Sequence, residues 1–286
     1  MKCRNGSYLH ARWAIVLVAV ALVGCEGTVT VDFGTQVPAD PTITSVLVEV
    51  DGVQFEKSDG SVQTLQFDSS QSVELMSYLD GAFRLFTEEQ LSDGTYTGIR
   101  LLFGDDEDEN NSVTSNGREF PLSLDETTEF SDVSFTVNKD DSSSDSIQLT
   151  LDLRQSLQFD EDDEDGTVLR PVIRAIRVED AGGIAGNVAV ACPANGSLAV
   201  YLFPNEVTPD DRDGADVEPY LTTGIGLNGT TAATGYGFPY VPEGTYTLAT
   251  TCRGDEETPG GNEDLDFRNA VTVEVDAEKS LTRNIP

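Results

Sequence analysis

The sequence predicts an all-β fold made of two β-sandwich domains of the immunoglobulin or prealbumin type. Apolar and polar residues alternate with a period of two along several segments, which is typical of half-buried strands. Tight-turn dipeptides of the Asp-Gly and Asn-Gly kind separate these segments. Helical stretches are few. Many short strands with turns at short intervals favour a sandwich over other architectures.

The alternation is clearest over residues 133–137, 147–153 and 271–275, where every second side chain is Val, Ile, Leu or Phe. Residues 72–79 and 87–91 are the only stretches expected to form a helical turn or two. The turns are expected at Asp51-Gly52, Asp59-Gly60, Asp93-Gly94, Asn116-Gly117 and Asn195-Gly196.

The N-terminus has the pattern of a bacterial lipoprotein signal peptide. Three basic residues precede an apolar run over residues 14–24, and the run ends in Leu22-Val23-Gly24-Cys25. A spanning helix needs about 20 apolar residues, so this run is too short to be a permanent membrane segment. We therefore expect residues 1–24 to be removed and Cys25 to be joined to diacylglycerol with further acyl (palmitate-type) chains.

Residues 25–41 contain Gly, Thr, Pro and Asp, and are expected to be the lipidated cysteine and a tether to the first domain. The membrane is thus the expected partner, reached through the N-terminal lipid. Glu26 stands where inner-membrane retention signals more often have Asp. By that resemblance the outer membrane is favoured, with the body facing the periplasm or the cell surface.

Processing would also remove His10 and Trp13, the only histidine and the only tryptophan. Without histidine the mature chain cannot form a Ser-His-Asp or Cys-His apparatus, or an imidazole-ligated metal site. Acidic residues number 51 against 17 basic ones, three of which lie before Cys25. So negative a surface repels nucleic acid, which is excluded as a partner.

Cys192 and Cys252 would remain as an even pair in an oxidising, exported compartment. A disulfide between them is expected, because no neighbouring His or Cys could complete a thiolate metal site. On the chain-entropy model this bond would stabilise the fold by roughly 4 kcal/mol.

A boundary near Asp180-Ala181-Gly182-Gly183 divides the chain into domains over residues 42–180 and 183–286. A short sequence, Gly-Thr-Tyr-Thr, follows a turn in each domain. We expect its tyrosines, Tyr96 and Tyr246, to bury their rings and to hydrogen-bond back to the neighbouring turn.

The first domain resembles a domain family of unknown function found in bacterial lipoproteins. The resemblance rests on four elements in the family's order, and the chain departs from the pattern only at Leu122-Ser123-Leu124. It implies an exported, lipid-anchored, β-rich domain and no activity. The four elements cover residues 79–81, 93–101, 151–157 and 169–174.

The second domain resembles a prealbumin-type or carboxypeptidase-regulatory-like sandwich. The matching pieces are residues 184–188, 198–203 and 238–246, of which the Val-Pro-Glu-Gly-Thr-Tyr element is the most specific. Modules of this kind act as spacers and binding platforms more often than as catalysts, and the resemblance sets an expectation of fold only.

Asp211, Asp213 and Asp216 are the candidate metal ligands, with calcium as the metal. Clustered loop carboxylates can supply part of the six to eight oxygens that calcium requires. This is no EF-hand loop, since Pro209 and Tyr220 would occupy its first and twelfth positions. The acidic runs over residues 105–109 and 160–165 are expected to be solvated loops.

Tyr236, Phe238 and Tyr240 alternate along one predicted strand and offer a surface for stacking on a sugar, although such aromatics more often lie in the core. Arg154, Arg170, Arg174 and Arg177 lie on or beside strands. Inter-strand ion pairs with nearby acids are expected of them, more than anion binding.

These observations predict a non-enzymatic, lipid-anchored envelope protein with a binding, adhesive or envelope-organising role, whose partner would be a glycan or another envelope protein. No catalytic residue and no cofactor is assigned, with calcium left open. The alternative is a carboxylate-dependent carbohydrate-active enzyme or a calcium-dependent glycan-binding module. An enzyme would need two carboxylates about 5 to 9.5 Å apart in a cleft.

Overall fold

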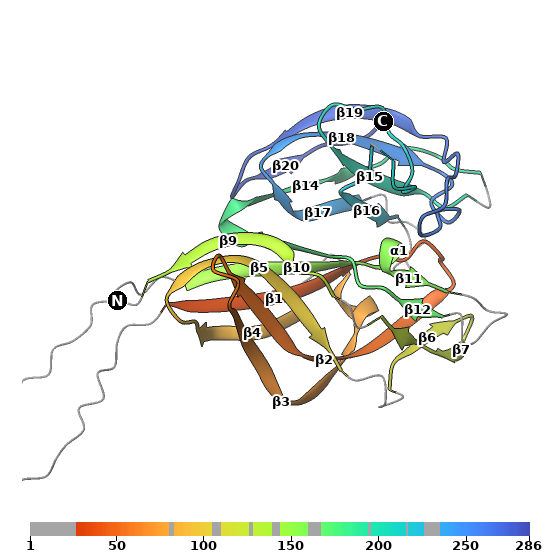
Figure 1. Ribbon diagram of the computed structural model, residues 1–286. Coiled ribbons are helices and arrows are strands. Elements are labelled where there is room, and N and C mark those ends of the chain that lie inside the picture. The colour runs from red at the N-terminus through yellow and green to blue at the C-terminus, as the bar shows by residue number, and fades with distance from the viewer. Residues whose placement is uncertain are drawn as a thin grey trace, which may run out of the picture.

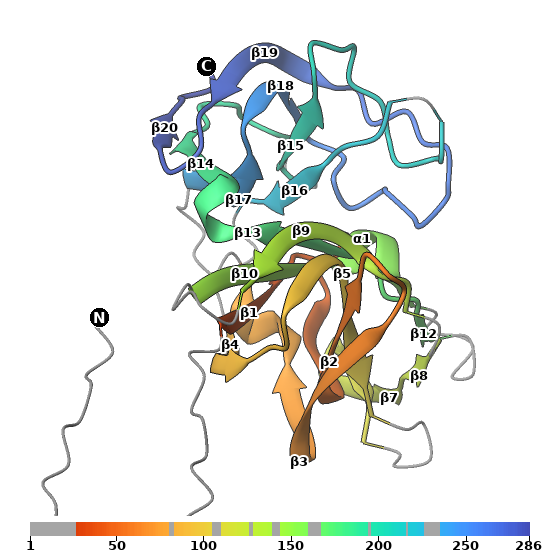
Figure 2. The same cartoon turned by 60° about the vertical axis from the view of Figure 1, so that its left-hand side comes forward.

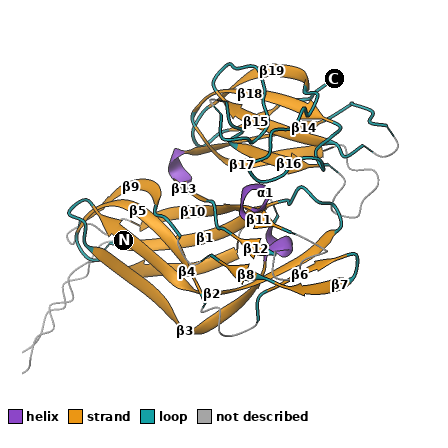
Figure 3. Ribbon diagram, turned by 45° about the vertical axis from the view of Figure 1, so that its right-hand side comes forward, coloured by secondary structure: helices purple, strands orange, loops and turns teal. Residues whose placement is uncertain are grey.

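The structure is a computed structural model that describes residues 27–286 except 80–82, 105–109, 126–127, 139–143, 160–166, 194–195, 216 and 226–234. The predicted all-β fold is confirmed. Strands dominate, and the helices of the described chain are single turns (Figure 3). Below, residues 27–180 are called the N-terminal unit and residues 181–286 the C-terminal unit.

The elements follow one another in this order: β1 (Thr28–Gln36), β2 (Ile43–Lys57), β3 (Val62–Glu74), η1 (Leu75–Tyr78), β4 (Phe83–Gln90), β5 (Gly94–Phe103), β6 (Ser112–Ser115), β7 (Arg118–Pro121), β8 (Ser123–Leu124), β9 (Ser131–Val137), β10 (Ser144–Asp152), α1 (Leu153–Ser156), β11 (Leu157–Gln158), β12 (Val168–Leu169), β13 (Ile173–Arg177), η4 (Val178–Asp180), β14 (Ala181–Asn187), β15 (Ala199–Pro204), β16 (Leu221–Gly224), β17 (Gly235–Pro242), β18 (Gly244–Thr251), β19 (Arg268–Val275) and β20 (Ser280–Thr282).

The N-terminal unit packs a sheet of order β13-β10-β1-β4 against a larger one of order β7-β6-β2-β5-β9, in which β3 also pairs with β2. Apolar residues from both sheets form one buried cluster between them, as a sandwich requires. A small sheet of order β11-β12-β8 closes one end. The C-terminal unit packs β17-β14-β20 against β16-β15-β18-β19, and lies above the N-terminal unit in Figures 1 and 2.

The predicted tether over residues 25–41 is wrong for most of its length. Thr28–Gln36 form β1, a central strand with β10 on one side and β4 on the other. Val29, Val31 and Phe33 are completely buried, because they alternate along the strand and point into the sandwich. The alternation of these residues with Thr30, Asp32 and Gly34 is present in the sequence, but the tether prediction rests on the Gly, Thr, Pro and Asp content of the segment and on its place after Cys25. Cys25 and the signal segment lie outside the described residues.

Turn chemistry is predicted correctly at Asn116-Gly117, which joins β6 to β7 with positive φ angles of 51° and 76°. That geometry is the one a two-residue hairpin favours. At Asp51-Gly52 the prediction is wrong, because β2 continues through it with a shift in register. A Cβ atom on Gly52 would lie 2.2 Å from the carbonyl oxygen of Leu65, so this glycine permits a close approach of strands and not a turn.

The two helical expectations fare differently. Residues 72–79 are strand up to Glu74 and then form a single 3₁₀ turn, η1. The Glu74 carboxylate caps this turn by accepting the Met76 N–H. The second is not helical, because residues 83–90 form β4 at the edge of the β1 sheet.

Both tyrosines of the repeated Gly-Thr-Tyr-Thr sequence behave as predicted. Tyr96 and Tyr246 have buried rings, and each hydroxyl donates to the carbonyl oxygen of the residue four positions earlier. The distances are 2.7 Å to Ser92 and 2.9 Å to Pro242. Each tyrosine therefore ties the start of its strand to the preceding turn.

The predicted disulfide is confirmed. Cys192 and Cys252 are bonded with their Cα atoms 5.4 Å apart, across a sequence separation of 60. Both side chains are only half-buried, at one end of the C-terminal unit.

Reducing this bond, or replacing both cysteines with serine, is expected to lower the free energy of unfolding by about 4 kcal/mol, because the unfolded chain regains the freedom of a long loop. Urea denaturation of the oxidised and reduced protein measures the difference. Equal midpoints and slopes would contradict the prediction.

Candidate functional site

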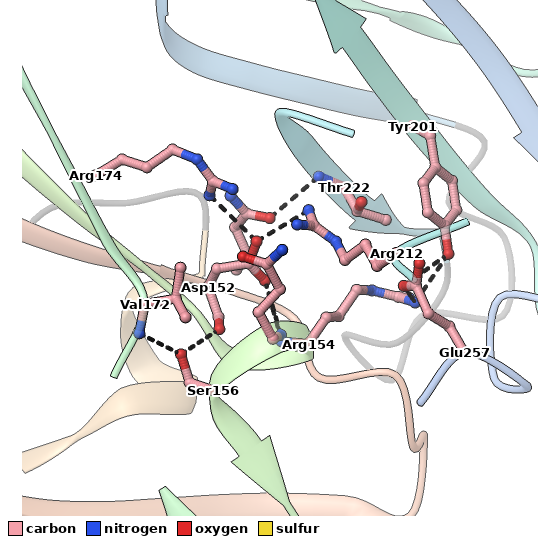
Figure 4. A network of polar contacts seen from close by, with 11 residues as sticks. Asp152, Arg154, Ser156, Val172, Arg174, Tyr201, Arg212, Thr222 and Glu257 are labelled. Carbon is pink, nitrogen blue, oxygen red and sulfur yellow. Dashed lines mark hydrogen bonds and ion pairs between the residues drawn. The ribbon is translucent and has the colours of Figure 1, made fainter. Parts of the chain in front are cut away.

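The most unusual feature of the chain is a set of buried charged residues between the two units. Six residues form it, and we call them the arginine latch (Figure 4). Arg154 reaches from the N-terminal unit to Glu257 and Tyr201 of the C-terminal unit, while Arg212 reaches back to Asp152. The latch consists of Asp152, Arg154, Arg174, Tyr201, Arg212 and Glu257.

Local structure fixes where the N-terminal members of the latch point. Asp152 ends β10 and caps α1, because its carboxylate accepts the N–H groups of Arg154 and Gln155 at 3.1 and 3.3 Å. The Ser156 hydroxyl donates to the Asp152 carbonyl at 2.6 Å and accepts the Val172 N–H at 2.9 Å. This single turn thereby directs the Arg154 side chain out of the sandwich and into the C-terminal unit.

Asp152 is the centre of the first half of the latch. Its carboxylate lies 3.1 Å from Nη1 of Arg174 and 2.9 Å from Nη2 of Arg212, and it is completely buried. Burial by itself would raise the pKa of Asp152, but the charges of Arg212 and Arg174 outweigh it, and the pKa lies below its usual value. The group therefore stays ionised.

Arg154 is the centre of the second half, and it is 2% exposed. Its Nη1 donates to the Gly254 carbonyl at 2.7 Å, to Glu257 Oε2 at 3.0 Å and to the Tyr201 hydroxyl at 3.2 Å. The Tyr201 hydroxyl itself donates to Glu257 Oε2 at 3.0 Å. Burial raises the pKa of Tyr201 far above its usual value, so the phenol remains a donor.

The latch is not fully satisfied within the described part of the chain. Nε and Nη2 of Arg154 and all three guanidinium nitrogens of Arg212 have no hydrogen-bond partner there, although Arg212 is ion-paired with Asp152. Buried charges with unfilled hydrogen bonds add little net stability compared with apolar packing. Separating the two units would take Arg154 from Glu257 and Arg212 from Asp152, and would leave each of these charges without its partner.

Chemically the latch is suited to holding and not to proton transfer. A general acid needs a raised pKa, and that of Asp152 is lowered. The four most buried acids, Asp32, Asp152, Asp211 and Glu257, all accept from an arginine or a backbone N–H. Among the residues that the structure describes, no group of three or more His, Cys, Asp or Glu side chains could hold a metal ion.

The predicted calcium ligands are not gathered at one described site. Asp211 is buried and accepts the N–H of Glu263, whereas Asp213 is half-buried and caps its own turn by accepting the Ala215 N–H at 2.8 Å. Asp216 lies outside the described residues, as do the runs 105–109 and 160–165. Calcium binding stays a prediction.

The aromatic stripe is mostly core. Tyr236 and Phe238 are 6% and 3% exposed and pack inside the C-terminal unit, so they cannot stack on a sugar. Tyr240 is half-buried and lines a groove of about 640 Å³ between the units.

The arginines pair with acids, as predicted. Arg177 lies 3.1 Å from Asp145 on the adjacent strand, and Arg170 lies 3.8 Å from Asp125. Arg212, Tyr201 and Glu257 were not predicted from the sequence as functional residues. The available signal was weak, namely a lone arginine inside an acidic loop over residues 210–216.

Comparisons with known proteins give a family and little else. The family described as "Domain of unknown function (DUF4382)" matches residues 26–171. No curated protein matches the chain. In the described part of the chain, no helix is both long and apolar enough to cross a bilayer.

Three solved structures show a distant likeness. The Bacillus anthracis TIE protein is 10% identical over 90% of this chain and 33% of that one, with a TM-score of 0.23, so the chain spans about a third of its length. The minor pilin of Streptococcus agalactiae is 11% identical over 90% and 94%, with a TM-score of 0.21. The fimbrial anchor protein of Porphyromonas gingivalis is 12% identical over 80% of each chain, with a TM-score of 0.17. Such low scores support no argument about function.

Proposed function

The chain belongs to the family defined by the domain of unknown function DUF4382, and from this premise we propose that it is a non-enzymatic protein of the bacterial cell envelope. In this proposal Cys25 bears the lipid, the outer membrane is the favoured location, and the two units are domains that act together as one rigid body. Its role is to bind a glycan or an envelope protein, or to organise the envelope. The finer likeness of the C-terminal unit to prealbumin-type modules remains part of the proposal.

The observation that supports this proposal most is the arginine latch. Two buried arginines, one from each unit, are used to join the units, and the carboxylates they meet are fixed as ion pairs. A protein that presents a binding surface at a set place benefits from such a junction, because a rigid body loses less entropy on binding. The alternative of a carbohydrate-active enzyme has less support. The four buried acids of the described chain already accept from an arginine or a backbone N–H, and Glu218, whose pKa burial raises, accepts the Gly214 N–H at 2.6 Å.

Replacing Cys25 with serine tests the lipid anchor. We expect the Cys25→Ser variant to leave the membrane fraction and to lose labelling by a radioactive or clickable fatty acid. Replacing Cys3, which precedes the apolar run, with serine is the matched control and is expected to change neither. Intact-mass spectrometry of the wild type should show a chain beginning at acylated Cys25. Unchanged fractionation of Cys25→Ser would remove the anchor from the proposal.

A panel of glycans, esters and peptides tests the absence of catalysis. The processed protein without lipid is expected to turn over none of them. Turnover at enzyme-like rates, abolished by changing a carboxylate pair in one cleft, would favour the enzyme alternative instead.

A further inference from the structure

We propose that the end of the N-terminal unit at which β1 begins lies directly on a lipid bilayer with zwitterionic headgroups, and that the arginine latch points away from it. This inference rests on the proposed function, because it takes the lipid to be on Cys25. It goes beyond that function by stating which surface of the protein meets the membrane and which kind of lipid surface suits it.

The first argument is the length of the connection. Only Glu26 and Gly27 separate Cys25 from Thr28, the first residue of β1. Three residue steps reach at most about 11 Å, even when fully extended. A lipid on Cys25 would therefore hold the start of β1 within about 11 Å of the headgroup layer.

The second argument is that β1 cannot detach to lengthen this connection. It pairs with β10 along its whole length, from Thr28 opposite Ser144 to Gln36 opposite Asp152, and with β4 on its other side. The pairing reaches back to the first described residue, since the Leu91 N–H donates to the Gly27 carbonyl at 3.2 Å. Releasing β1 would expose its buried apolar side chains, which makes it a rigid attachment.

The pairing also identifies the surface at this end. Ser144 begins β10 beside Thr28, and it lines the groove of about 640 Å³ between the units. Glu179, Glu278 and Lys279 line the same groove. The groove and the short helix η4 therefore lie at the end that the lipid would hold, and both units contribute to that end.

Charge decides which lipid surface fits. The exposed side chains beside the start of β1 and in the groove are mainly acidic. Two basic residues lie among them, and both are ion-paired: Lys279 with Asp276, and Arg177 with Asp145, Glu179 and Asp180. The acids outnumber these two bases, so the surface keeps a net negative charge. Anionic headgroups would repel this surface within a Debye length, whereas zwitterionic headgroups would not. The exposed acids are Glu88, Glu89, Glu179, Asp180 and Glu278.

The position of the opposite, far end of the N-terminal unit, away from the membrane, also follows from β1. Gln36 lies eight residues beyond Thr28, which is about 26 Å along an extended strand. Asp152, α1 and the latch are at that end, and Figure 1 shows α1 at the right while the red start of β1 lies at the left. The loop over residues 253–257, which supplies Glu257 to the latch, thus points away from the membrane.

The processed chain suits a direct test, because it has no tryptophan, and Cys25 is its only thiol once Cys192 and Cys252 are bonded. Cys25 is coupled to a maleimide-headgroup lipid in phosphatidylcholine vesicles that contain a nitroxide-headgroup lipid. A tryptophan is placed at the near end by Glu179→Trp or, as a second variant, Glu278→Trp. The far-end control is Glu256→Trp, also an exposed glutamate in an ion pair.

We expect quenching of the near-end tryptophans to be at least twofold stronger than quenching of the far-end one. Equal quenching, or stronger quenching of Glu256→Trp, would overturn the orientation. Replacing about a third of the phosphatidylcholine with phosphatidylglycerol should weaken near-end quenching at low salt, and added salt should restore it. No response to anionic lipid would overturn the charge argument. Because the coupling is chemical, the vesicle experiment tests the orientation that a lipid on Cys25 imposes, whereas the Cys25→Ser experiment in cells tests whether that lipid is present. The two failures are therefore distinguishable.

Discussion

Replacing Arg154 with alanine is expected to lower the free energy of unfolding by about 5 kcal/mol. Breaking a buried ion pair from one side typically costs about 3–5 kcal/mol, because the remaining charge is left buried without its partner. Here that charge is Glu257, whose side chain is 1% exposed, and the Gly254 carbonyl and the Tyr201 hydroxyl lose a donor as well. Urea denaturation followed by circular dichroism measures the loss.

The same variant should also uncouple the two units. We expect a single calorimetric transition in the wild type and two in Arg154→Ala, because the junction weakens while each sandwich keeps its own core. Arg84→Ala is the matched control, since Arg84 pairs with Asp32 but is 56% exposed, and such pairs contribute about 0–1 kcal/mol. Replacing Arg154 and Glu257 together with methionine should recover much of the loss. If the double variant were no more stable than Arg154→Ala, the loss could not come from leaving the Glu257 carboxylate buried without its partner.

Replacing Asp152 with alanine is expected to have a comparable effect, about 5 kcal/mol. Its carboxylate is the ion-pair partner of Arg174 and Arg212, and Arg212 is itself 2% exposed. The change also removes the cap of α1, a loss that typically costs about 1 kcal/mol. Asp276→Ala is the control, because its partner Lys279 is largely exposed. A loss below about 1 kcal/mol in Asp152→Ala would show that the buried pairs are not stabilising.

Acid pH offers an independent readout of the same carboxylate. The pKa of Asp152 is lower in the folded protein than in the unfolded chain, so its contribution to stability is present above the unfolded value of about 4. That contribution is lost as the pH falls through the folded value. The difference in stability between the wild type and Asp152→Asn should therefore shrink as the pH is lowered below about 4. A constant difference down to about pH 2 would contradict this.

Local features of the fold are predictable from the sequence, because they depend on neighbouring residues. The alternation of Val133, Phe135 and Val137 along β9 is visible in a window of a few residues, and so is the Asn116-Gly117 turn. The disulfide could be predicted from the expected exported compartment and from the even number of cysteines, since the predicted processing would leave only two cysteines besides Cys25.

β1 shows where this kind of prediction fails. The alternation of Val29, Val31 and Phe33 with polar residues indicates a strand, whereas the Thr, Asp and Gly content and the place after Cys25 favour a linker, and the prediction of a tether follows the composition. The sequence does not show that this strand lies in the centre of its sheet, between β10 and β4. A central strand is defined by partners that lie far along the chain, and a local window does not contain them.

The latch could not be predicted from the sequence for a similar reason. Arg154 and Glu257 are 103 residues apart, and the chain has 51 acidic residues with which an arginine could pair. Nothing in residue type separates Glu257 from the exposed Glu256 beside it. Only the packing of the two units decides which carboxylate is enclosed and which is left in water.

The central position of β1 has a consequence for biogenesis. This strand is synthesised well before Ser144 to Asp152, the segment that it needs before its sheet can close. Such long-range parallel pairing forms late and slowly, and until then an apolar segment has no cover. In the exported, lipid-anchored protein that we propose, this segment is also next to the lipid, so a periplasmic chaperone that shields it would act on the N-terminal strand first.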